Sequence, residues 1–199
     1  MKKIFIFIFF LTLVNFQNKS EAYSTDPKQF IAEIVEEAKK ILVAGNDKKF
    51  REKKLSEIAM QTVDIEGIGN YSLGKYRKNL SEDNLKEYKT LFKKYFLKSF
   101  TSRLSDYSDP KIEVLSAEIK NPKYTIVKSI LVATEKKPEV KIDWRVYTKN
   151  PEKPLIRDLI IEGLSLARTQ KEEFASVIES NDGDIKKLFL TLKEFVSKP

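Results

Sequence analysis

Cysteine and histidine are both missing from the 199 residues of this chain. Without cysteine no disulfide can form, so the stability of the fold must come from the packing of its core. The two missing residue types also exclude cysteine nucleophiles, serine–histidine–aspartate triads and metal sites with imidazole or thiolate ligands. Most of the common hydrolytic mechanisms are therefore excluded, and a binding function gains weight.

Long apolar runs are also missing, except near the start of the chain. The run at residues 4–14 follows two lysines, and it is shorter than the roughly 20 residues that span a bilayer. Ser20 and Ala22 then place small residues at the two positions that a signal peptidase reads. We therefore expect residues 1–22 to be a secretory signal peptide and residues 23–199 to form a single domain. No cysteine is available for a lipid anchor at the cleavage site.

Blocks of like charge are missing as well. Removal of residues 1–22 takes away three lysines and one glutamate, which lowers the formal net charge from +8 to +6. Charges spread along the chain indicate a solvated surface, with at most a weak attraction to anionic headgroups or acidic partners. The sequence has no basic-aromatic binding motif, so a nucleic acid partner is not expected.

The first half of the remaining chain has apolar residues at helical spacing. The pattern predicts helices over residues 26–45, 47–60, 64–73 and 81–104, the third of them interrupted by Gly67 and Gly69. Asp26 and Pro27 form a typical helix start, and Ser81 is placed to cap the longest helix.

The second half changes to a period of two, which is typical of strands. Strands are predicted to begin near Ile112 and to cover residues 124–134, 140–146 and 154–163, and two helices follow at 166–180 and 184–196. Short turn-like connections favour antiparallel neighbours. The predicted fold is α+β: a four-stranded twisted antiparallel sheet covered by about six or seven helices, with the long helix at 81–104 as the natural cover.

Several acidic pairs could in principle perform acid–base chemistry. An acid–base pair needs two carboxylates in one cleft with separated pKa values, which a sequence does not reveal. The candidate pairs are Asp64 with Glu66, Glu82 with Asp83, and Asp158 with Glu162. Glu82 and Asp83 are better explained by their place in the first turn of a helix, where negative charge is favourable. Residues 181–184 have a faint likeness to a calcium loop, but a turn followed by a helix cap is the favoured interpretation.

The helix predicted at 81–104 is unusually aromatic. At about 100° per residue its apolar side chains spread over about 220° of its surface, more than an ordinary surface helix buries. Such a face could pack against two protein layers, or against one layer and a ligand. The pattern by itself favours the plain core.

Two stretches and the order of the elements resemble the MlaC family, also called the toluene-tolerance auxiliary proteins. The first stretch, residues 72–107, has a Leu-Gly-Lys-Tyr turn, the Ser81 cap and then Phe92 and Phe96. The second, residues 157–178, has an aspartate, the sequence Glu-Gly-Leu-Ser and Phe174. The resemblance spans nearly the whole chain after residue 22.

The resemblance implies a function as well as a fold. Members of this family are periplasmic phospholipid carriers with an architecture similar to NTF2-like proteins, in which an apolar cavity between sheet and helices takes the acyl chains. They exchange lipid with an outer-membrane lipoprotein complex and an inner-membrane ABC transporter complex, and they catalyse no reaction. For this chain the resemblance therefore implies a periplasmic monomer with phospholipid as cargo, no cofactor and no metal.

With the resemblance in view, we expect eleven residues to line the cavity, although each is also a plausible core residue. The long helix supplies Phe92, Phe96 and Phe100. The third strand supplies Val140, Ile142, Trp144 and Val146. The neighbouring strands supply Val114, Val127, Leu131 and Ile161.

Three other hypotheses stay open at this point. The cargo could be another lipid such as a hopanoid, which a related branch of the family is associated with. The chain could be an isomerase on an NTF2-like scaffold, which requires a carboxylate inside the cavity. Alternation places Asp143 on the wet face and leaves Asp158 as the strand acid to examine. It could also be an adaptor with a filled core and no cavity.

Overall fold

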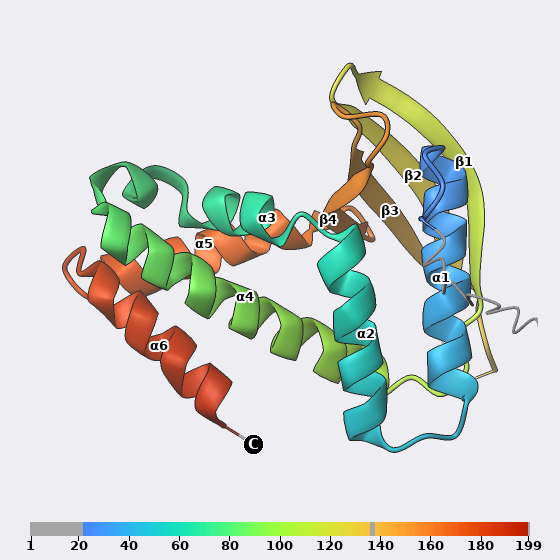
Figure 1. Cartoon of the computed structure of the whole chain (residues 1–199), viewed down its shortest axis with the longest axis horizontal. Helices are drawn as coiled ribbons and strands as arrows, with labels where there is room; N and C mark the ends of the chain where they lie inside the picture. Colours follow the sequence, from blue (N-terminus) through green and yellow to red (C-terminus); the bar gives the residue numbers. More distant parts are fainter. Residues whose placement is uncertain (1–21, 136–137, 199) are drawn as a thin grey trace, which may run out of the picture.

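The computed structural model describes residues 22–135 and 138–198, so the expected signal sequence, apart from Ala22, lies outside the described residues. Six α-helices, one 3-10 helix and five strands occur in these two ranges (Figure 1). The first part comprises α1 (Pro27–Val43), α2 (Lys48–Thr62), α3 (Ile65–Leu73), η1 (Gly74–Asn79) and α4 (Glu82–Ser105). The second comprises β1 (Ile112–Asn121), β2 (Tyr124–Leu131), β3 (Val140–Tyr147), β4 (Leu155–Ile161), β5 (Leu164–Ser165), α5 (Leu166–Glu179) and α6 (Ile185–Ser197). This order confirms the α+β prediction.

Each α-helix begins after an aspartate or a serine that caps it. Asp26 Oδ1 accepts a hydrogen bond from the backbone N–H of Gln29 at 2.8 Å, and Ser81 Oγ accepts one from Asn84 at 3.2 Å. Caps of this kind contribute about 1 kcal/mol each to helix stability. Asp184 caps α6 by accepting from Lys186, which confirms the turn-and-cap interpretation of residues 181–184.

The sheet has the order β1-β2-β3-β4-β5 with antiparallel neighbours throughout, as predicted. The fourth strand ends at Ile161, earlier than predicted, because Glu162 and Gly163 form a tight turn with φ values of +50° and +82°. Gly163 adopts this left-handed conformation without steric cost. Leu164 and Ser165 then pair back onto β4 as a fifth strand, which the sequence pattern did not reveal.

The cover of the apolar sheet face differs from the prediction. The helix that packs on β1 and β2 is α1, whereas α4 lies against α2, α3 and α6 and extends away from the sheet (Figure 1). Helix α1 therefore covers the β1 and β2 part of the sheet, and α4 faces only β3 and β4. Periodicity shows that a helix has an apolar face, but it does not show which neighbour that face meets. Contacts with three helices account for part of the wide apolar arc of α4.

Helix α3 is continuous, although the sequence suggested an interruption at its two glycines. Gly69 is required because Phe92 lies against it: a Cβ atom at this position would lie 2.7 Å from Phe92 Cδ1. The buried Tyr88 also reaches this turn, where its hydroxyl donates to the carbonyl oxygen of Gly69 at 2.8 Å. The glycine thus serves close packing between α3 and α4 rather than a break.

The junction between α2 and α3 is attached to the sheet. Val63 forms a parallel bridge with Ile156 of β4, and the N–H of Asp64 donates to the Ile156 carbonyl oxygen at 2.9 Å. The carboxylate of Asp64 forms an ion pair with Arg157 Nη2 at 2.6 Å. These contacts hold α3 beside β4, where the functional site is found.

Candidate functional site

An apolar cavity of about 370 Å³ lies between α4, α5 and the strands β3 and β4. Helix α4 contributes four aromatic side chains, Phe92, Tyr95, Phe96 and Phe100. The sheet contributes Trp144, Ile156, Leu159 and Ile161, and α5 contributes Leu166, Ala167, Thr169 and Gln170. Two exposed charged residues, Arg103 and Glu173, also border it. The cavity therefore presents a wall of aromatic rings opposite a wall of branched aliphatic side chains.

The aromatic wall is continuous along α4. The rings of Phe96 and Phe100 are stacked with centroids 5.6 Å apart and planes 11° apart, and Phe92 follows at 6.2 Å from Phe96. Residues four apart lie on the same side of a helix, which aligns the three rings. Phe92 is buried and fixed by Gly69, whereas Phe96 and Phe100 are half-buried.

The polar atoms of Trp144 and Tyr95, two of the rings that border the cavity, have partners within the protein. Trp144 Nε1 donates to Ser129 Oγ at 2.9 Å, and Ser129 Oγ donates to the carbonyl oxygen of Ile142 at 3.0 Å. The Tyr95 hydroxyl donates to Gln170 Oε1 at 2.8 Å, and burial raises the pKa of Tyr95. The phenol therefore stays neutral at physiological pH, so these groups leave the cavity suited to apolar ligands.

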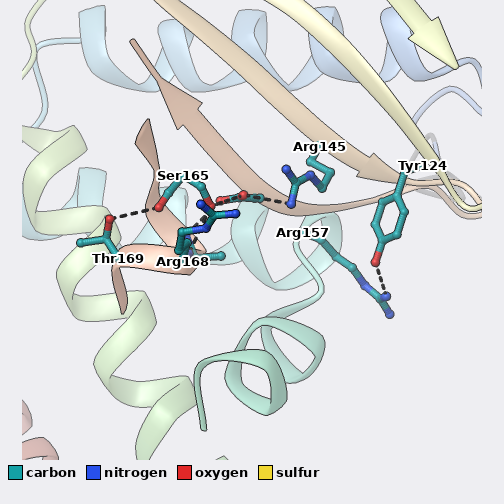
Figure 2. Close-up of polar contacts among 8 residues, drawn as sticks. Tyr124, Arg145, Arg157, Ser165, Arg168 and Thr169 are labelled. Atoms are coloured by element: carbon teal, nitrogen blue, oxygen red, sulfur yellow. Dashed lines mark hydrogen bonds and ion pairs between the residues drawn. The ribbon is translucent and has the colours of Figure 1, made fainter. Parts of the chain in front are cut away.

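Helix α5 is anchored at its start by the buried carboxylate of Asp158. Its Oδ2 accepts from Ser165 Oγ at 2.6 Å, and its Oδ1 accepts from the N–H of Ala167 at 2.9 Å. Arg145 Nη1 completes the network at 3.4 Å from Oδ2 (Figure 2). A negative charge at a helix N-terminus is favourable, so Asp158 fixes the wall of the cavity that α5 provides.

This network bears on the isomerase hypothesis. Asp158 borders the cavity, which is the position that the hypothesis requires. A general base must, however, have an oxygen free to reach the proton of the substrate. Both oxygens of Asp158 accept hydrogen bonds from the protein, from Ser165 and Ala167. The geometry therefore favours a structural role for this carboxylate.

We expect the replacement of Asp158 by alanine to lower the free energy of unfolding by about 2–4 kcal/mol, because a buried N–H and a hydroxyl lose their acceptor. Chemical denaturation of the lipid-free protein measures this loss. Asp143, half-buried on the neighbouring strand, provides the matched control, and D143A should change stability by less than about 1 kcal/mol. Equal stability of D158A and the wild type would show that the carboxylate does not anchor α5.

The eleven residues expected from the sequence divide into two groups. Five border the cavity, and they are Phe92, Phe96, Phe100, Trp144 and Ile161. Six lie outside its lining, and they are Val114, Val127, Leu131, Val140, Ile142 and Val146. Val127 and Val146 are fully buried in the core, and Val114 and Ile142 pack against it. For the three residues of β1 and β2, the reason is that α1, and not the cavity, lies over this part of the sheet face.

Sequence reasoning missed most of the α5 side of the cavity. Leu166, Thr169 and Gln170 border it at a spacing of three to four residues, which is the signal of one helix face. Ile156 and Leu159 were missed for another reason. They are three residues apart, so a regular strand would place them on opposite faces of the sheet. A register irregularity opposite Arg145 and Val146 of β3 places both on the face that carries Trp144.

Across residues 22–135 and 138–198, no three acidic side chains gather closely enough to form a candidate metal site. In the same ranges no helix has the length and apolar character needed to cross a membrane.

Comparisons with known proteins bear on the family and the fold of this chain. No match was found among curated proteins. A solved structure of a phospholipid-binding protein from Ralstonia solanacearum, in complex with a phospholipid, is similar to this chain with a TM-score of 0.71 and 18% sequence identity. The match covers 88% of this chain and 97% of that one. The family model described as "MlaC protein" matches residues 16–194. This chain therefore belongs to the MlaC family.

Proposed function

We propose that this protein is a periplasmic lipid carrier that encloses the acyl chains of a glycerophospholipid in the cavity between α4, α5 and β3–β4. The observation that carries the proposal is the apolar, aromatic-lined cavity in a member of the MlaC family. The phospholipid in the structurally similar Ralstonia protein supports the same ligand class. We further propose that the carrier exchanges its cargo with an outer-membrane lipoprotein complex and an inner-membrane ABC transporter complex.

The energetics of lipid in water explain why a carrier is needed. A lipid with two acyl chains has roughly 30 methylene groups, and at about 0.8 kcal/mol each their exposure costs on the order of 20 kcal/mol. Spontaneous passage through an aqueous compartment is correspondingly slow. Enclosure requires only an apolar surface, which is what the rings of Phe92, Phe96 and Phe100 supply together with Trp144. Neither a metal nor a nucleophile is needed for this work.

The size of the cavity has a consequence for binding. A volume of about 370 Å³ lies near the lower end of the range of small-molecule sites, about 300–1,000 Å³. Two full acyl chains need more space than this, so the proposed function requires the cavity to widen when lipid binds. The half-buried Phe96 and Phe100 are the side chains best placed to turn outward as the cavity widens.

The proposal is tested on the chain without residues 1–22, purified from a bacterial periplasm. Native mass spectrometry should show a lipid bound in about a one-to-one ratio, and labelled phospholipid should pass from vesicles to the protein. Protein without bound lipid and without uptake from vesicles would overturn the proposal. Extraction of a polycyclic lipid instead of a phospholipid would change the cargo to a hopanoid-like molecule and leave the carrier mechanism intact.

A further inference from the structure

A second, larger cleft lies on the opposite face of the sheet from Trp144. It has a volume of about 1030 Å³ and extends from β2 and β3 to α3, η1 and α5. Tyr124, Lys128, Asp143 and Arg145 border it, and alternation along β2 and β3 directs them away from the apolar cavity. Alternation along β3 predicts only a solvent-exposed face at this place.

The cleft is strongly basic. Six cationic side chains border it, and they are Arg77, Lys120, Lys128, Arg145, Arg157 and Lys171, against the single acid Asp143. Neighbouring acids neutralise some of these cations. Asp158 pairs with Arg145, Asp64 pairs with Arg157, and Glu118 pairs with both lysines of the strands. Among the described residues, no ion pair neutralises Arg77 or Lys171. Lys171 Nζ lies 5.2 Å from the centre of the Tyr71 ring, a contact that leaves its positive charge uncompensated by any acid.

One cation of the cleft is rigidly held. The Arg157 guanidinium donates to Asp64 Oδ2 at 2.6 Å and to Tyr124 Oη at 3.0 Å, the latter drawn in Figure 2, and its carbon lies 3.5 Å from the centre of the Tyr147 ring. Partial burial lowers the pKa of Arg157, but the bonds to Tyr124 and Asp64 outweigh burial and raise it. The charge is therefore permanent and fixed in place.

The basic cleft and the apolar cavity share a wall. Ile68 of α3, Arg157 of β4 and Ala167 of α5 border both. A ligand group that lies against this wall of the cavity is therefore only one layer of side chains away from the basic cleft. This proximity distinguishes the cleft from an unrelated patch of surface lysines.

We propose that the basic cleft binds the phosphate of an anionic phospholipid headgroup, such as phosphoglycerol, while the acyl chains occupy the apolar cavity. This inference rests on the proposed carrier function. Guanidinium groups match the geometry of phosphate oxygens, and the unpaired Arg77 and Lys171 supply the charge that a headgroup without its own cation leaves uncompensated. A zwitterionic headgroup carries its own ammonium or choline and gains less from this cleft.

The test is competition between two lipids. The chain without residues 1–22 is stripped of lipid and incubated with vesicles of equal parts phosphatidylglycerol and phosphatidylcholine, and the lipids that it captures are measured by mass spectrometry. We expect the lipid captured by the wild type to contain about five times more phosphatidylglycerol than phosphatidylcholine. A preference of about this size is what two exposed ion pairs contribute to binding. The double variant R77Q/K171Q should capture the two lipids in nearly equal amounts. The ratio is the readout, so a general loss of uptake does not imitate the effect.

A matched control removes the same charge elsewhere. Lys28 and Lys40 are exposed on α1, outside the cleft, and K28Q/K40Q should keep the wild-type enrichment. The enrichment should also fall as salt is raised, because exposed charges more than about 8 Å apart are screened at physiological ionic strength.

Each other outcome has a definite meaning. Capture of both lipids in the vesicle ratio by the wild type overturns the headgroup inference and leaves the carrier function standing. Capture of neither lipid overturns the carrier function, and this inference with it. If inorganic phosphate binds at the cleft but captured lipid shows no enrichment, the ligand is free phosphate. If anionic vesicles cosediment with the protein through Arg77 and Lys171 without enrichment, the cleft is a membrane contact, and the inference is again overturned.

Discussion

Replacement of Ser99 by tryptophan should reduce captured lipid by at least tenfold while the protein stays folded. Ser99 is half-buried on α4 between Phe96 and Phe100, and its small side chain borders the apolar cavity. An indole at this position occupies the space that the acyl chains need, and it adds apolar contacts instead of removing any. Lipid per protein molecule is measured by mass spectrometry after purification, and folding is measured by circular dichroism and thermal unfolding.

The control for this prediction is K94W, on the exposed side of the same helix. It introduces the same side chain into α4 without entering the cavity, and lipid capture should match that of the wild type. If S99W retained the full amount of lipid, the acyl chains would have to lie outside this cavity, and the basis of the proposed function would be lost.

Replacement of Phe92 by alanine should lower the free energy of unfolding by about 3–5 kcal/mol, the usual cost of truncating a buried phenylalanine. Phe92 is only 2% exposed, and its ring contacts those of Tyr88, Tyr95, Phe96 and Phe174. Urea denaturation measures the change. The protein must first be refolded without lipid, since a ligand bound only to the native state adds to the apparent stability.

Phe50 offers a comparison within the same chain. It is 41% exposed on α2, so F50A should cost less than about 1 kcal/mol. A loss below about 1 kcal/mol in F92A as well would show that α3, α4 and α5 do not depend on this ring for their packing. In that case other residues would have to hold the part of the cavity wall where Phe92 lies.

The period of the apolar residues was sufficient to predict the class of fold. It gave the positions of the helices and the first four strands because each of these elements buries one face and wets the other. It also identified Trp144 as inward-facing on β3, where alternation is regular. The sequence does not predict which part of this sheet face lies under α1 and which part borders the cavity. Val127 and Trp144 pair directly across β2 and β3, and both are apolar residues that alternate with polar ones, so the pattern does not distinguish them.

The β4 part of the cavity shows a different limit. The register irregularity opposite Arg157 shifts the phase of the strand, so Ile156 and Leu159 face the same side. A strict period of two along β4 therefore assigns either Ile156 or Leu159 to the wrong face of the sheet. The basic cleft was missed for a third reason: its cations come from six separate elements, and only the folded chain brings them together.

Strand β1 forms the outer edge of the sheet, and its irregular register has a consequence for self-association. The pairing with β2 is broken between Val114 and Ser116 and again between Ile119 and Asn121. A regular edge would be a template for another copy of the chain to add a strand, and the 79% exposure of the Ile119 side chain would favour this. The two bulges, together with the charges of Glu118 and Lys120, oppose such growth into fibrils. The most exposed strand of the sheet thus carries built-in protection against aggregation.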